Sequence, residues 1–278
     1  MKNNDETMNV HNPVVSIVTV AYNAVTTIEN TILSIINQTY PNIEYIIIDG
    51  GSTDGTVDII KKYEDRVSFW LSESDKGIYD AMNKGIDKVS GEWINFMNTG
   101  DTFYKETVIE EFVSKVSVDT DIAYGNTMFI LSIGQVLERP KELSLINKGM
   151  VFGHQATFVR SSLHKKHKFD ISFRSSGDYN FFYQMYNAGC CFEYIPLTVV
   201  NYDGEQGMSI DNMFTVKRED ARIQNKDKNL IWIISFYITV TIYKFKKLLK
   251  QILPIQFINY MRIMNLRKKD KFTLNDSN

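Results

Sequence analysis

Apolar residues follow two alternating periods over the first hundred positions, and this alternation predicts strands and helices in turn. The run 14–22 is β-branched and continuous, as in a strand buried on both faces, and three further strands are predicted over 43–50, 66–73 and 92–98. Three segments between them repeat apolar residues at helical spacing: 26–38, 54–63 and 78–89. The order predicts an α/β fold, with a parallel sheet and helices on both of its faces.

The pattern becomes mixed after Asp101. Further helices are predicted over 107–116 and 178–189, and strands over 121–130, 135–140 and 191–202. We expect one α/β domain over 13–228, with halves at 13–101 and 102–228. A polar extension, 1–12, precedes this domain, and an apolar and basic helical tail, 229–278, follows it.

Polar side chains follow the four predicted strands of the first half, each at the carboxyl end. They include Asn23, Asp49, Asp75 and Asp101. Open α/β sheets bind ligands at this edge, so these groups are expected to share one rim. The first loop has no G-x-G-x-x-G motif, which disfavours a Rossmann dinucleotide-binding site. The chain has no G-x-x-x-x-G-K-[ST] motif, which excludes a P-loop. Carboxylates without a phosphate-cradling loop indicate phosphates held through Mg²⁺ or Mn²⁺.

Charge and cysteine content indicate a cytoplasmic protein with a basic tail. The two cysteines, Cys190 and Cys191, are adjacent, so they form no disulfide framework, and we expect core thiols in a reducing compartment. The first twelve residues lack the apolar stretch of a signal peptide. The whole chain carries −2, but residues 244–278 carry +7, which leaves −9 for the body. A basic tail on an acidic body points to an anionic partner surface.

Five segments, in order, resemble the motifs of the family 2 inverting glycosyltransferases with a GT-A fold. They are VSIVTVAYNA, IIIDGGSTDGT, SDKGIYDAMNKGI, GEWINFMNTGD and SSGDYNFF, and the resemblance runs from about Pro13 to Ser209. DKGIYDAMNKGI is especially similar to a bacterial branch that builds capsule, exopolysaccharide and lipopolysaccharide. The resemblance implies a GT-A, Rossmann-like, mostly parallel central sheet with flanking helices. It also implies inverting transfer of a sugar, with UDP the expected nucleotide, to a glycan or polyprenyl-linked acceptor.

The resemblance makes the first half the nucleotide-sugar half and the second the acceptor side. It implies that Val20, through its backbone, and Tyr22 contact the base, although Tyr22 could also merely cap the core. Asp49 could accept the N3–H of uracil or form a turn in its Gly-rich loop. The resemblance assigns Ser52 to the donor site, but its residue type supports a helix-capping role at least equally.

The next motifs are expected to meet the sugar and diphosphate. Asp75 is placed beside the ribose or sugar, and Asn83 beside the nucleotide-sugar, with helix surface and packing as its alternative. The family commonly has Asp-x-Asp-Asp where this chain reads Asn98-Thr99-Gly100-Asp101. Only Asp101 remains as an acidic metal ligand, with Asn98 beside the donor, so the site for Mg²⁺ or Mn²⁺ is thin. His154 could be a metal ligand, an acceptor contact or an ordinary hydrogen-bonding residue.

Asp178 begins a predicted helix after a glycine. An aspartate in this place can be an N-cap. The resemblance makes it the general base that takes the proton of the acceptor hydroxyl, and both roles can hold together because a helix start favours an ionised carboxylate. Asn201–Ser209 is expected to form a loop over the donor diphosphate, with an ordinary surface loop as the alternative.

The tail and two other functions complete the expectations. Residues 230–243 are uncharged but shorter than the roughly 20 residues of a spanning helix. With the lysines that follow, they suit an amphipathic helix on the inner face of the membrane, although packing on the domain or dimerisation would also bury them. A sugar nucleotidyltransferase would want a Gly-rich basic loop where the chain reads AYNAVTTIEN. A degenerate nucleotide-sugar-binding module has the thin NTGD segment as its support. No nucleic-acid partner is expected, because no recognition motif accompanies the basic tail.

Overall fold

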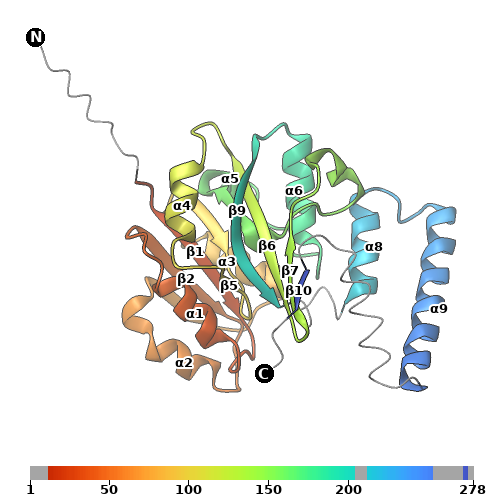
Figure 1. The fold of residues 1–278 in the computed structure, drawn as a ribbon, viewed down its shortest axis with the longest axis horizontal. Helices are drawn as coiled ribbons and strands as arrows, with labels where there is room; N and C mark the ends of the chain where they lie inside the picture. The colour runs from red at the N-terminus through yellow and green to blue at the C-terminus, as the bar shows by residue number, and fades with distance from the viewer. Residues whose placement is uncertain (1–11, 204–211, 253–271, 275–278) are drawn as a thin grey trace, which may run out of the picture.

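The computed structural model describes residues 12–203, 212–252 and 272–274 as one mixed sheet with helices on its faces (Figure 1). The sheet order is β10-β7-β6-β8-β4-β1-β2-β3, and β9 pairs with both β5 and β6. The strands are β1 (Val15–Ala21), β2 (Ile43–Asp49), β3 (Phe69–Ser72), β4 (Trp93–Phe96), β5 (Thr102–Phe103), β6 (Ile122–Leu131), β7 (Gly134–Glu138), β8 (Thr157–Arg160), β9 (Phe192–Asp203) and β10 (Phe272–Leu274).

Eight labelled α-helices and three 3₁₀ helices are described in these ranges. The α-helices are α1 (Ile28–Ile36), α2 (Thr56–Lys62), α3 (Ile78–Ile86), α4 (Val108–Lys115), α5 (Ser161–Lys166), α6 (Gly177–Asn187), α8 (Met213–Ile223) and α9 (Leu230–Ile252). The 3₁₀ helices are η1 (Glu64–Arg66), η2 (Leu143–Lys148) and η3 (His154–Ala156).

The predicted donor half, 13–101, is a parallel sheet buried on both faces. β3, β2, β1 and β4 lie side by side with parallel register, and every residue of β1 is buried. One face of β1, including Ile17, packs against α1, α2 and α4. The other face, including Val18, packs against α3 and α6. Alternate side chains of one strand therefore supply two cores, which is why the strand is apolar throughout.

The predicted acceptor half, 102–228, joins this sheet through antiparallel strands. β8 pairs antiparallel with both β4 and β6. β9 runs parallel to β6 and ends in antiparallel pairing with β5, the two-residue strand that follows Asp101. Figure 1 shows β9 running alongside β6. The predicted mixed α/β fold, with a mostly parallel sheet and flanking helices, is confirmed.

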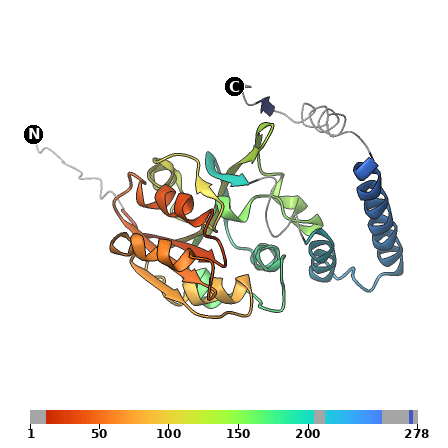
Figure 2. The same cartoon turned by 90° about the horizontal axis from the view of Figure 1, so that it is seen from below.

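The tail begins outside this body. Figures 1 and 2 both place α8 beside the domain and α9 on the far side of α8. Within the described residues, no helix has the length and apolar character that crossing a membrane requires. The extension 1–12, the loop from Asn201 to Ser209 and the tail after residue 252 fall largely outside the described residues.

Two features differ from the sequence expectations. β10, in the tail that was expected to be helical, pairs antiparallel with β7. The expectation of two core thiols is wrong, because Cys191 is exposed and Cys190 is only partly buried.

Candidate active site

The carboxyl ends of four neighbouring strands meet at one edge of the sheet. β2 ends at Asp49, and β3, beside it, leads into Asp75. β1 ends next to Asn23, and β4 leads into Asn98 and Asp101. Parallel pairing brings these ends to the same edge, so the rim expected from the sequence is present.

A notch at the β2 end gathers Tyr22, Gly50 and Asp75. A Cβ atom on Gly50 would lie 2.4 Å from Oδ2 of Asp75 and 3.3 Å from the ring of Tyr22. The absence of a side chain at Gly50 therefore gives the Asp75 carboxylate room to lie close to the β2 loop. The ring of Tyr22 is 67% exposed, which leaves it free to stack on a planar group.

The Asp49 carboxylate holds the loop that follows β2. Its Oδ2 accepts hydrogen bonds from the backbone N–H of Gly51 and Ser52 (3.1 and 2.9 Å) and from Oγ of Ser72 (2.6 Å). Its Oδ1 accepts one from Oγ of Ser52 (2.5 Å), and the same Ser52 Oγ accepts the N–H of Asn23 (2.7 Å). Asp49 is fully buried. The hydrogen bonds of Asp49 and Ser52 therefore fix the conformation of the loop after β2.

Val20 and Asn83 also have partners within the protein. Val20 is buried in β1, and its carbonyl accepts the N–H of Thr99 at 3.4 Å. The Asn83 amide exchanges two 2.9 Å hydrogen bonds with the backbone of Phe169. The pair ties α3 to the segment before α6. Contact of Val20 or Asn83 with a donor stays a prediction.

Asp101 lies at the floor of the rim, where it is 5% exposed. Its Oδ2 accepts a hydrogen bond from Nε2 of Gln155 at 3.0 Å, and its carbonyl accepts Oγ1 of Thr31 at 2.8 Å. Burial raises the pKa of Asp101 to about 7. A cation at this carboxylate would favour its ionised form.

Asn98 and His154 link this floor to the acceptor half. The Nδ2 of Asn98 lies 3.4 Å from Nε2 of His154, and the opposite ring nitrogen, Nδ1, lies 3.6 Å from Oδ2 of Asp178. Burial lowers the pKa of His154, against the pull of the Asp178 carboxylate. The ring is therefore neutral at neutral pH. If Nε2 accepts from Asn98, the ring carries its proton on Nδ1, toward Asp178.

Asp178 stands in the first turn of α6, with its side chain 20% exposed. Its Oδ1 accepts the hydroxyl of Tyr79, from the start of α3, at 3.0 Å. Burial, and then the Asp178 charge, raise the pKa of Tyr79 well above its ordinary value, so the hydroxyl stays a donor. A Cβ on Gly177 would lie 2.8 Å from the Tyr79 ring, and the glycine thus allows this close packing. Two flanking groups orient the carboxylate while leaving it accessible.

The rim offers few protein ligands for a divalent metal. Asp101 offers a carboxylate, and Oδ1 of Asn98 is buried without a hydrogen-bond partner in the described part of the chain. No cluster of three or more His, Cys, Asp or Glu side chains could hold an ion among the residues described. Mg²⁺ and Mn²⁺ take hard oxygen ligands and often bind through one or two carboxylates plus substrate phosphates. Both ring nitrogens of His154 face side chains, which favours hydrogen bonding over metal ligation.

Sequence reasoning missed Tyr79 and Gln155. Tyr79 lies in the DKGIYDAMNKGI motif and Gln155 follows His154, but a tyrosine on an apolar helix face and a lone glutamine carry no signal of their own. Glu73 and Glu92, which had no assigned role, form ion pairs with Lys84 and Arg160.

A family model described as glycosyl transferase family 2 matches residues 16–187. The chain belongs to this family. It is a glycosyltransferase, as are its named relatives. A glycosyltransferase of Mycobacterium tuberculosis is 34% identical over 61% of this chain and 67% of its own length. One from Haemophilus influenzae is 29% identical over 94% of this chain and 88% of its own. A PGL/p-HBAD biosynthesis glycosyltransferase of Mycobacterium bovis is 26% identical over 71% and 79%.

Solved family structures share the fold at low identity. Staphylococcus aureus TarS 1–349 in complex with UDP-GlcNAc is 16% identical, with a TM-score of 0.60 over 75% of this chain and 66% of its own. The mannosyltransferase PcManGT from Pyrobaculum calidifontis, in complex with GDP-Man and Mn²⁺, is 14% identical, with a TM-score of 0.61 over 77% and 63%. This chain thus spans less than two thirds of these structures.

Proposed function

We propose that this glycosyltransferase moves a sugar from a UDP-sugar to a glycan or lipid-linked acceptor, with inversion at the anomeric carbon. The observation that carries the proposal is the Asp178 carboxylate, held by Tyr79 and facing His154 at the acceptor side of the donor rim. The UDP-GlcNAc complex of TarS, a structural neighbour, supports the choice of nucleotide. Synthesis of a bacterial surface polysaccharide, in the cytoplasm, is the setting that we propose.

The proposed step is one in-line displacement. Asp178 takes the proton of the acceptor hydroxyl as that oxygen bonds to the anomeric carbon. The bond from this carbon to the β-phosphate oxygen breaks, and its electron pair leaves with UDP. Attack from the face opposite the leaving group inverts the carbon. Tyr79 binds Oδ1 of Asp178, and Oδ2, which lies 3.6 Å from Nδ1 of His154, would take the proton.

The donor would lie across the rim. Tyr22 stacks on the base, Asp75 binds the ribose or sugar, and the loop tied by Asp49 and Ser52 shapes the notch. Asp101, with Asn98, would hold Mg²⁺ or Mn²⁺, which neutralises charge on the diphosphate when bound. The Mn²⁺ complex of PcManGT supports this assignment.

The test is a calorimetric titration of the purified protein with UDP, GDP, dTDP and CMP, each with and without Mn²⁺. We expect UDP to bind best, and tighter with Mn²⁺ by about tenfold or more. Asp101→Ala should remove the metal effect but leave metal-free binding in place. Equal binding with and without Mn²⁺ would contradict the metal site. Tight binding without transfer would favour the degenerate binding module.

A second proposal concerns α9. Its outer face exposes large apolar side chains at Leu230, Ile231, Ile234, Tyr237, Ile238 and Ile242, each at least 50% exposed. Lysines follow this stretch from Lys244 onward. An apolar face followed by cationic residues suits the surface of an anionic membrane. We therefore propose peripheral docking through α9, which would bring the site to a lipid-linked acceptor.

Vesicle flotation tests this docking. The full chain should float with vesicles containing anionic lipid and less with neutral ones, and Ile231→Ser/Ile238→Ser should weaken flotation. Val118→Ser/Ile171→Ser, exposed apolar positions in the catalytic domain, is the matched control. A chain that dimerises through α9 in solution and ignores vesicles would overturn the proposal.

A further inference from the structure

The turn that leads into Asp178 is held by hydrogen bonds to a side chain from another helix. The backbone N–H groups of Arg174, Ser175 and Ser176 all donate to the Glu219 carboxylate, at 2.8, 2.9 and 2.8 Å. Ser176 is the N-cap residue of α6 but makes no side-chain cap. The three N–H groups lie in the turn before α6 and at its N-cap, where backbone donors outside regular structure need acceptors, and Glu219 of α8 supplies one carboxylate to all three.

Two more contacts from α8 bracket the same segment. A guanidinium N–H of Arg222 donates to Oγ of Ser172 at 3.0 Å, and the group lies over the ring of Phe173. The side-chain amide of Gln224 donates to the hydroxyl of Tyr179 at 3.2 Å. Tyr179 directly follows Asp178. The contacts of α8 therefore extend from before the turn to the residue after it.

We propose that Glu219 is a positioning residue for Asp178, and that α8 is the brace that holds the proposed base in register with Tyr79 and His154. This inference rests on the proposed role of Asp178 as the base. Glu219 lies outside the strand-end rim and is not expected to contact the donor. It acts by fixing the turn from which the Asp178 carboxylate projects, and an error of about 1 Å in such a group can cost on the order of 100-fold in rate.

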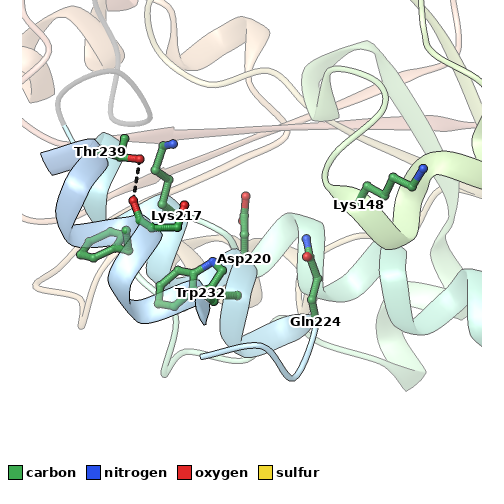
Figure 3. A pocket seen from close by; sticks show the side chains of 9 residues that line it. Lys148, Lys217, Asp220, Gln224, Trp232 and Thr239 are labelled. Carbon is green, nitrogen blue, oxygen red and sulfur yellow. Dashed lines mark hydrogen bonds between the residues drawn. The ribbon is translucent and has the colours of Figure 1, made fainter. Parts of the chain in front are cut away.

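The brace rests in turn on α9. The guanidinium of Arg218 lies 5.0 Å from the ring centre of Phe236, and the ring of Phe214 packs edge-on against both Phe236 and Tyr243. A pocket of about 210 Å³ is lined by both helices and by Lys148 of η2, and Figure 3 shows Asp220 of α8 near Trp232 of α9 at this pocket. The inner face of α9 thus supports α8, while its outer face is exposed.

The experiment compares Glu219→Ala and Glu219→Gln with Lys217→Ala, an exposed position on the same helix. Turnover is followed as UDP release from UDP-sugar with water as acceptor. In this reaction Asp178 takes a proton from water, whose oxygen bonds to the anomeric carbon as UDP leaves. Glu219→Ala should lower kcat by about 10- to 100-fold, with the KM for donor and the Kd for UDP within about twofold. Glu219→Gln, which keeps one acceptor oxygen, should fall between Glu219→Ala and the wild type, and Lys217→Ala should match the wild type.

Hydrogen exchange supplies a readout that does not depend on activity. Amides 174–176 should exchange faster in Glu219→Ala, with the amides of β1 and β2 unchanged. Unchanged kcat despite faster exchange would overturn the inference, and so would parallel loss of UDP binding and kcat, since that marks a merely structural role. Asp178→Asn is assayed alongside. If it retains UDP release, the proposed base itself fails, whereas loss in Asp178→Asn with none in the Glu219 variants rejects only the brace.

Discussion

Two aspartates of the site, Asp49 and Asp178, are held in opposite ways. Asp49 bonds mainly to its own loop, through Gly51 and Ser52. Asp178 is oriented by side chains from elsewhere, and its hydrogen-bond partner Tyr79 is 99 residues away. The predicted donor edge is therefore built locally and the proposed reaction centre by distant contacts, so we expect that the two can be disrupted separately.

Asp178→Asn gives the sharpest separation and the largest expected effect. The amide cannot take a proton, so transfer and UDP release should fall by about 10³-fold. UDP affinity measured by calorimetry should stay within about twofold of wild type. A variant that loses binding as well would show that the two regions are not independent.

Asp49→Ala should do the converse. It leaves two N–H groups and two hydroxyls of the donor edge without their acceptor, which should cost about 3 kcal/mol of unfolding free energy and most of the UDP affinity. Chemical denaturation and calorimetry measure the two effects. Asp58→Ala, at an exposed carboxylate of α2 just after this loop, is the control and should cost clearly less. Equal losses in the two variants would argue against a special role for Asp49.

Tyr79→Phe removes the hydroxyl that donates to Asp178 while keeping the ring. Loss of a hydrogen bond to a charged group should lower kcat by about tenfold with donor KM nearly unchanged. Steady-state kinetics of UDP release measures both parameters. Tyr45→Phe, a buried tyrosine whose hydroxyl faces Thr19, should leave kcat unchanged, and a matching drop there would point to general loosening.

Asp220→Asn has the smallest expected effect. Burial raises the pKa of Asp220 to about 6, so the folded state binds a proton more tightly than the unfolded state does. The stability due to this proton is present below about pH 4 and is lost as the pH rises through about 6. The amide in the variant does not titrate. As the pH rises from about 4 to about 6, the wild type therefore loses stability that the variant does not lose, and the Tm of the variant minus the Tm of the wild type should increase. Asp119→Asn, at an exposed carboxylate, should show no such trend.

The sequence predicts the donor half well because its determinants are local. The burial of β1 on both faces and the helical spacing of α1 and α3 appear as patterns within about ten residues. The four strand ends follow from the order of the elements. The roles of Val20, Tyr22, Asp75 and Asn83 toward a donor remain predictions.

The acceptor half resists prediction because its determinants are pairings of distant residues. No periodicity in the sequence indicates that the Glu219 carboxylate accepts hydrogen bonds from residues 174–176, or that Gln155 donates one to Asp101. The packing of the tail is equally hard to predict from the sequence. An apolar run predicts the helix α9, but not that one face packs on α8 while the other is exposed.

The pairing of β5 with β9 bears on how the chain matures during synthesis. Thr102 follows Asp101 directly, and its partner Asn201 is 99 residues further along. Until the ribosome has delivered β9, the Asp101 carboxylate of a nascent chain lacks this cover and stays hydrated and ionised. The raised pKa of Asp101 is thus acquired late, and a chain arrested before β9 would carry the donor-edge motifs without a finished floor.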